Sequence, residues 1–98
     1  AALAAYVRSL GRELNRSNVI ATGILPGGFI APENAMARLQ EANPEAYGSF
    51  IEERLPRQIM GEAEELIPML LLLCSEGASM MGGCLVPIDA GEGRAYSL

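Results

Sequence analysis

A run of apolar residues from Val19 to Leu25 constrains the fold most, because it shows no clean alternation of apolar and polar side chains. A strand with one face in water alternates, whereas a strand covered on both faces does not. The run ends at Pro26-Gly27-Gly28. Proline removes a backbone donor there, and glycines permit close approach of a ligand. The pattern predicts a strand over 19–25, buried on both faces of an α/β fold.

A helical pattern precedes this strand. Apolar residues recur at spacings of four, three and four, which places them on one face of an amphipathic helix over 1–17. They are Leu3, Val7, Leu10 and Leu14. Gly11 has no side chain, so a neighbouring helix can pack closely against this part of the helix, either from within the chain or from another subunit.

A second helix and a second strand are predicted further on. Residues 62–75 begin with acidic side chains and continue with an almost wholly apolar stretch, which predicts a helix buried on several sides. Pro68 predicts a kink or a late helix start. Residues 84–89 are predicted as a strand, at a sheet edge because Pro87 lacks an N–H, and residues 90–98 as a tail.

The segment between the core elements, 26–60, contains two short helical patterns, one over 33–41 and one that begins at Asn43-Pro44. It holds most of the aromatic residues of the chain. A long insertion of this kind often serves as a lid or binding loop. The alternative is a pair of surface helices without a ligand.

Composition excludes several classes of function. The 98 residues suffice for one domain at most, and a net charge of −5 without any Lys argues against nucleic acid as a partner. The longest apolar run, 66–74, is interrupted by a proline and falls short of the roughly 20 residues of a membrane-spanning helix. The absence of His removes His-based nucleophile pairs and the commonest metal ligand, so no metal site is predicted.

The cysteines and the first residues complete the composition. Cys74 and Cys84 lie among apolar residues, so we expect buried, reduced thiols and a cytoplasmic protein. Ala1 opens directly into a helical pattern, which suggests a piece of a longer chain.

Taken in order, these features resemble the C-terminal part of a short-chain dehydrogenase/reductase. The matching pieces are Ala1-Ala2-Leu3, Ser9-Leu10-Gly11-Arg12-Glu13-Leu14, Pro26-Gly27, Gly61 with Glu65, Leu73-Cys74-Ser75-Glu76-Gly77-Ala78-Ser79, and Gly83 with Ile88-Asp89-Ala90-Gly91. The resemblance implies the last part of a doubly wound, Rossmann-like parallel sheet. It also implies that the glycine-rich cofactor turn and the catalytic Ser, Tyr and Lys lie upstream of Ala1, so no catalytic residue is assigned in this segment.

The resemblance further implies a cofactor contact. In the family, backbone groups after the Pro-Gly turn meet the nicotinamide carboxamide of NAD or NADP; here these are Pro26, Gly27, Gly28 and Phe29. Three positions depart from the family pattern, with Ala31 where Thr is frequent, Thr22 where Asn is common and Ala90 where Gly is common.

The same resemblance implies a substrate pocket and subunit contacts. The loop that follows closes over the substrate in the family, which makes candidates of its apolar side chains, with packing of the loop on itself as the alternative. These candidates are Phe29, Met36, Tyr47, Phe50 and Met60. Family members pair subunits through the opening helix and through the last helix and strand, here 66–73 and 84–88, so a homo-oligomer, dimer or tetramer, is implied.

Two functions follow from this reading of the sequence. The first is part of an NAD(P)-dependent oxidoreductase that transfers hydride between nicotinamide and a carbonyl or alcohol substrate, with this segment supplying the nicotinamide wall, the substrate lid and the oligomer contacts. The alternative is a non-catalytic, truncated module that serves in oligomerisation or interaction.

Overall fold

A computed structural model describes residues 1–93, which divide into two compact units. The first unit contains Ala1–Leu25 and Leu66–Pro87. The second contains Pro26–Glu65 and the chain from Ile88 onward. Of the predicted tail over 90–98, residues 94–98 lie outside the described part of the chain. None of the helices within residues 1–93 is both long and apolar enough to span a bilayer.

The central strand pair consists of β1 (Gly23–Pro26) and β4 (Leu85–Ile88). The Gly23 N–H donates to the Cys84 carbonyl at 2.9 Å, and the Gly27 N–H donates to the Ile88 carbonyl at 3.0 Å. The donors and acceptors advance along both strands in the same direction and by the same step, so the strands run parallel. The prediction of an α/β fold with parallel strands is confirmed.

β1 is shorter than the strand predicted over 19–25, because the first residues of the run bond elsewhere. The Val19 N–H donates to the Leu14 carbonyl at 3.2 Å and so belongs to the end of the preceding helix. The Ala21 carbonyl accepts from the Gly83 N–H at 2.7 Å, and the Thr22 hydroxyl donates to the Met81 carbonyl at 3.0 Å. Ladder bonding therefore begins only at Gly23.

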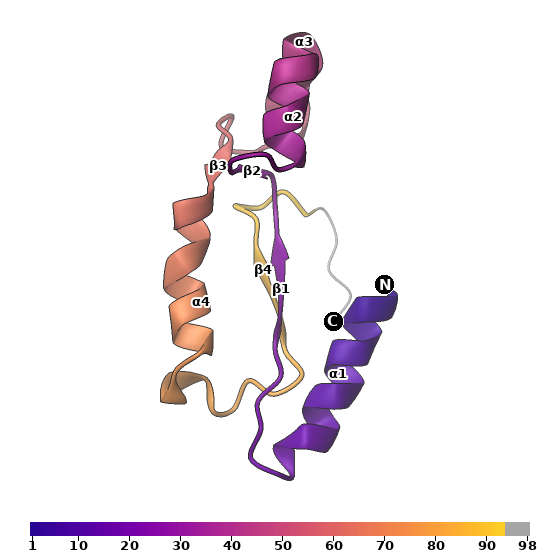
Figure 1. The fold of residues 1–98 in the computed structure, drawn as a ribbon, viewed down its shortest axis with the longest axis vertical. Helices are drawn as coiled ribbons and strands as arrows, with labels where there is room; N and C mark the ends of the chain where they lie inside the picture. Colours follow the sequence, from indigo (N-terminus) through magenta and orange to yellow (C-terminus); the bar gives the residue numbers. More distant parts are fainter. Residues whose placement is uncertain (94–98) are drawn as a thin grey trace. The chain divides into compact units, whose positions relative to one another are not determined.

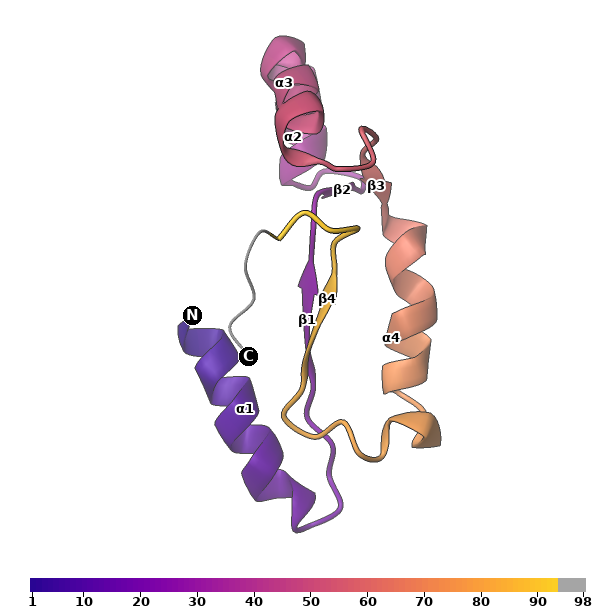
Figure 2. The ribbon, with the colours of Figure 1, turned by 180° about the vertical axis from the view of Figure 1, so that it is seen from behind.

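Two helices flank β1 and β4 on opposite sides within the first unit (Figures 1 and 2). The helix α1 (Ala2–Asn15) half-buries Val7, Leu10 and Leu14, whereas Leu3 is 73% exposed. Gly11 is buried, and a side chain there would overlap the backbone of Gly83. The close packing at Gly11 is thus made by a loop of the same unit, not by a helix.

The helix α4 (Ile67–Leu73) follows a 3₁₀ turn, η1 (Ala63–Leu66), so it starts later than residue 62 and carries Pro68 in its first turn. The late start expected from Pro68 is confirmed, since a proline in the first turn breaks no helical hydrogen bond. Burial on several sides was the wrong prediction for the described structure, because Ile67, Leu71 and Leu72 are 47%, 67% and 48% exposed.

The chain after α4 corrects two further predictions. The helix ends at Leu73 rather than 75, because the Ser75 hydroxyl accepts from the Gly77 N–H and caps a separate 3₁₀ turn, η2 (Glu76–Ala78). Cys74 is therefore exposed at the helix end, not buried, while Cys84 is half-buried beside β4. Pro87 is exposed in β4, one of two strands in its sheet, which agrees with the edge position predicted from its missing N–H.

The second unit contains the helical hairpin α2 (Ala35–Ala42) and α3 (Pro44–Arg54), whose helices pack against each other. Asn34 and Asn43 begin these helices by accepting from the N–H groups of Ala37 and Ala46. The unit also pairs β2 (Phe29–Ile30) with β3 (Gly61–Glu62) in parallel, opposing Phe29 to Gly61. This pairing was absent from the sequence-based expectation, because neither pair of residues has a strand-like pattern of its own.

Candidate functional site

The turn Pro26-Gly27-Gly28 lies at the carboxyl end of β1 and is hydrogen-bonded on two sides. The Gly27 N–H donates to the Ile88 carbonyl at 3.0 Å, and the Gly28 N–H donates to the Glu92 carboxylate at 2.6 Å. On the other side, the Gly28 carbonyl accepts from the Gly61 N–H at 3.0 Å. The peptide groups of this turn therefore have a defined orientation.

The space around the turn excludes a side chain at Gly27 and is tight at Gly28. A Cβ on Gly27 would lie 2.7 Å from the Cβ and 2.8 Å from the Cα of Asp89. A Cβ on Gly28 would lie 3.0 Å from Phe50 Cε1 and 3.2 Å from Leu55 Cδ2. The turn is thus enclosed by residues 88–92 at Gly27 and by apolar side chains at Gly28.

The segment that approaches Gly27 is a turn organised by Asp89. Its carboxylate accepts from the N–H groups of Gly91 and Gly93, both at 3.1 Å. Ala90 has φ 51 and Gly91 has φ 84. These are left-handed conformations, which glycine adopts more readily than alanine. The structure therefore explains why a glycine would suit position 90, where this chain departs from the resemblance.

The residue after the turn, Phe29, opposes Gly61 across the parallel pairing of β2 with β3. In a parallel pair, two opposed residues differ in their bonding. One residue forms hydrogen bonds to the two sequence neighbours of its partner, and the N–H and C=O of the partner point away from the pairing. Gly61 takes the first role, because its N–H bonds to Gly28. The N–H and C=O of Phe29 consequently face away from β3, where the carbonyl accepts from Asn34 Nδ2 at 3.0 Å.

The five predicted substrate residues all lie in the second unit and are half-buried. Phe29 follows the glycine turn and Phe50 lies against Gly28, so these two are brought to the same place. Met36 lies in α2, Tyr47 in α3 and Met60 just before β3. A cavity of about 280 Å³ beside β2 is lined by other residues, namely Ile30, Ala31, Pro32, Ala37, Glu62, Ala63 and Glu64.

Two residues at the turn were missed by the sequence analysis. Leu55 is 5% exposed and packs towards Gly28, although it stands next to a proline that marks a helix end. Glu92 lies in a segment predicted as a tail and meets a partner 64 positions away. No local pattern of sequence could have shown either contact.

An exposed ion pair stabilises the loop that leads to β3. Arg57 Nη1 lies 3.0 Å from Glu65 Oε2, and Glu65 Oε1 accepts from the Glu62 N–H at 2.9 Å. The hydrogen bond from Arg57, and then that from Glu62, lower the pKa of Glu65 below its ordinary value of 4.5.

Replacement of this arginine is expected to raise the pKa of Glu65. In Arg57→Ala, the carboxylate loses its charged donor, so its titration midpoint moves towards 4.5. In the wild type the pair stabilises the fold fully above the ordinary pKa, and this contribution is lost as the pH falls through the lowered folded pKa. Side-chain NMR titration measures the shift, with Arg38→Ala as control; an unchanged midpoint in Arg57→Ala would contradict the assignment.

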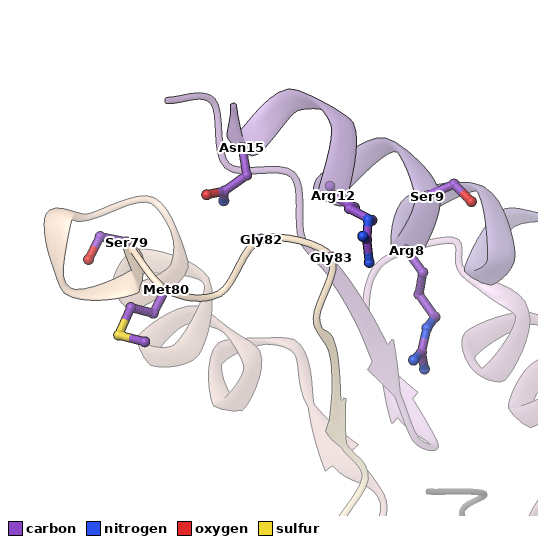
Figure 3. Close-up of a pocket in the computed structure, with 9 residues that line it drawn as sticks. Arg8, Ser9, Arg12, Asn15, Ser79, Met80, Gly82 and Gly83 are labelled. Carbon is purple, nitrogen blue, oxygen red and sulfur yellow. The ribbon is translucent and has the colours of Figure 1, made fainter. Parts of the chain in front are cut away.

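The first unit contains a hollow of about 660 Å³ between α1 and the loop before β4. Figure 3 shows Arg8 and Arg12 side by side on α1, with their guanidinium groups directed to the same side of the helix. Asn15, Ser79 and Met80 add to its lining. The hollow is lined by cationic and polar side chains, and no local pattern of the sequence predicts it.

No group of three or more His, Cys, Asp and Glu side chains suited to a metal ion occurs in residues 1–93. The ligands that this part of the chain offers at the glycine turn are backbone N–H and C=O groups. Such groups suit an amide or another neutral polar group of a bound cofactor.

Comparison with known proteins gives consistent matches. Residues 1–92 match the model of a family described as enoyl-(acyl carrier protein) reductase. Levodione reductase of Leifsonia aquatica is 35% identical over 92 residues, which cover 91% of this chain and 34% of the relative. The 3-oxoacyl-[acyl-carrier-protein] reductase MabA of Mycobacterium avium is 33% identical over 96 residues, covering 98% of this chain and 35% of the relative.

Solved structures agree with these sequence matches. The crystal structure of levodione reductase superposes with a TM-score of 0.79 at 33% identity, covering 95% of this chain and 37% of that one. L-Sorbose reductase from Gluconobacter frateurii, solved with NADPH and L-sorbose, gives 0.81 at 25% identity, covering 97% and 38%. The chain thus spans about a third of the length of the curated relatives it matches.

Proposed function

This chain belongs to the short-chain dehydrogenase/reductase family, and on that premise we propose that it is the C-terminal part of an NAD(P)-dependent oxidoreductase. The proposed reaction transfers hydride between the nicotinamide ring and a carbonyl or alcohol substrate. The catalytic residues belong to the part of such an enzyme that precedes this segment. When bound, the nicotinamide cofactor supplies or accepts the hydride; the residues of this chain bind and orient it.

The arrangement of the glycine turn carries this proposal. The turn lies at the carboxyl end of a parallel strand, where open α/β sheets bind their ligands. Its own N–H groups are used by Ile88 and Glu92, whereas the N–H of Phe29 faces away from β3 and the Phe29 carbonyl accepts from Asn34 Nδ2. Within the segment Pro26, Gly27, Gly28 and Phe29, we therefore assign the carboxamide contact to the backbone of Phe29, with the two glycines providing the close approach.

The helical hairpin is proposed as the substrate lid. Phe50 reaches the glycine turn from α3, and Met36, Tyr47 and Met60 are half-buried in the same unit. Apolar and aromatic side chains over a nicotinamide site suit the carbon skeleton of a carbonyl or alcohol substrate. Carbonyl reduction is also named in the relatives described above, levodione reductase and 3-oxoacyl-[acyl-carrier-protein] reductase.

Cofactor binding tests the proposal directly. The full-length protein that contains this chain is titrated with NADH or NADPH. We expect the protein fluorescence to fall or the fluorescence of the bound cofactor to rise. The full-length protein should also reduce a carbonyl test panel at the expense of that cofactor. Failure of both cofactors to bind, by fluorescence and by calorimetry, would overturn the proposal.

The alternative, a non-catalytic oligomerisation or interaction module, draws support from the exposed face of α4. Ile67, Leu71 and Leu72 are about half or more exposed there, and such apolar groups gather at subunit contacts. The oxidoreductase proposal uses the same face, together with 84–88, for pairing identical subunits. A protein that oligomerises but binds neither NADH nor NADPH would favour the module.

A further inference from the structure

We propose that Glu92 is a positioning residue for the nicotinamide wall, holding the Gly27-Gly28 peptide so that the backbone of Phe29 presents its N–H to the cofactor. This inference rests on the proposed function and deepens it. It concerns a residue that touches the turn and not the cofactor itself.

The contact that carries the inference is short and charge-assisted. Glu92 Oε1 accepts from the Gly28 N–H at 2.6 Å, and Glu92 is half-buried. The same oxygen lies 2.9 Å from the position that a Cβ on Gly27 would occupy and 3.4 Å from the corresponding position on Gly28. The carboxylate is thus seated directly against both glycines. Hydrogen bonds to ionised acceptors are shorter and stronger than neutral ones.

The segment that carries Glu92 is itself held in place. The Glu92 N–H donates to the Asp89 carbonyl at 3.0 Å, and the Asp89 carboxylate binds the N–H groups of Gly91 and Gly93. One residue earlier, the Ile88 carbonyl accepts from Gly27. Consecutive N–H groups of the glycine turn are therefore bound by one compact segment, 88–92.

The geometry links this bond to Phe29. Glu92 holds the Gly28 N–H, which belongs to the Gly27-Gly28 peptide, and Gly61 holds the Gly28 carbonyl, which belongs to the Gly28-Phe29 peptide. The Gly28 carbonyl and the Phe29 N–H lie in the same planar peptide group. A rotation of the backbone at Gly28 therefore also turns the Phe29 N–H. Glycine resists such rotation weakly, because its backbone has more accessible conformations than any other residue. The bond to Glu92 restrains the peptide before Gly28 and the bond to Gly61 restrains the peptide after it, so loss of the Glu92 bond frees one side of this flexible residue.

Two substitutions separate the hydrogen bond from the charge. Glu92→Gln removes the charge and keeps an amide oxygen at the same reach, whereas Glu92→Asp keeps the charge on a side chain one methylene shorter. A positioning role predicts that Glu92→Asp and Glu92→Ala raise the Kd and KM for NADH or NADPH about tenfold, the effect of losing a hydrogen bond to a charged acceptor. Glu92→Gln should stay within about threefold of the wild type, and kcat at saturating cofactor should change little.

Glu53→Ala is the matched control, since Glu53 is an exposed residue of α3 in the same unit and its replacement changes the net charge equally. Amide hydrogen exchange at residues 26–29, measured without cofactor, provides a second readout. It should accelerate in Glu92→Ala and Glu92→Asp, but not in Glu92→Gln or Glu53→Ala.

The outcomes separate the role of Glu92 from the proposed function. A wild type that binds neither NADH nor NADPH overturns the proposed function, and the cofactor role of Glu92 with it. If the wild type binds the cofactor, and Glu92→Ala and Glu53→Ala have equal Kd and KM values for it, only the role of Glu92 is overturned. Equal losses in Glu92→Gln and Glu92→Ala, with unchanged exchange at 26–29, would also contradict it, because the charge would then matter and the bond would not.

Discussion

The 98-residue chain by itself is expected to show no sharp thermal unfolding transition as a monomer. Among residues 1–93, Leu55 and Ala78 are the only apolar side chains that are almost completely buried. Large apolar side chains remain exposed, with Met80 at 93%, Leu3 at 73% and Leu71 at 67%. Folding stability is a difference of about 5–15 kcal/mol between far larger favourable and unfavourable free energies, so a core this small leaves no margin.

Self-association is the expected consequence, because β1 and β4 form a two-stranded sheet with an open edge on each strand. Differential scanning calorimetry and sedimentation velocity, both at several concentrations, measure the behaviour. The predicted result is a broad or concentration-dependent transition together with oligomers. A sharp, concentration-independent transition of a monomer would refute the expectation.

The second large effect is expected from Gly27→Ala in the full-length protein. The new methyl group would lie 2.7 Å and 2.8 Å from atoms of Asp89, one of them in the backbone, so the turn and the segment 88–92 have to move apart. Overpacking of this kind costs about 1–3 kcal/mol. It would lower Tm by about 2–4 °C for each kcal/mol, and it should also weaken NADH or NADPH binding, since Gly28 and Phe29 move with the turn.

Gly48→Ala is the matched control for that substitution. Gly48 lies within α3, and nothing comes within 4 Å of a Cβ placed there. Alanine in an exposed helix is favoured over glycine by about 0.5–1 kcal/mol, so this variant should gain stability. Chemical denaturation of both variants measures the difference. A Gly27→Ala protein as stable as the wild type would show that the turn is not enclosed as described.

Local features of the fold were predictable because neighbouring residues decide them. Asn43 begins α3 as an N-cap and Pro44 occupies its first turn, as the sequence predicts. Pro68 delays α4 in the same manner. The family resemblance, carried by motifs such as Pro26-Gly27, agrees with the match over residues 1–92.

The sequence-based predictions were wrong where residues far apart in the sequence decide the hydrogen bonds or the burial of a segment. The strand predicted from residue 19 starts at Gly23 because Ala21 and Thr22 bond to the loop before β4. Cys74 lies in an apolar context along the chain and is nevertheless exposed, because only one side of α4 faces the strand pair (Figure 1). An apolar sequence thus indicates a tendency to be buried, and the packing partners decide whether burial occurs.

The amino-acid sequence alone determined the order of the helices and of the strands β1 and β4, the glycine turn at the end of β1 and the family, since these depend on short-range propensity and spacing. Tertiary structure alone decided that Gly61 bonds to Gly28, that Gly11 packs against Gly83 and that Glu92 holds the turn across 64 positions. The local sequence around a residue is compatible with many contact partners. The partner that it contacts across a long sequence separation is therefore decided by the whole fold.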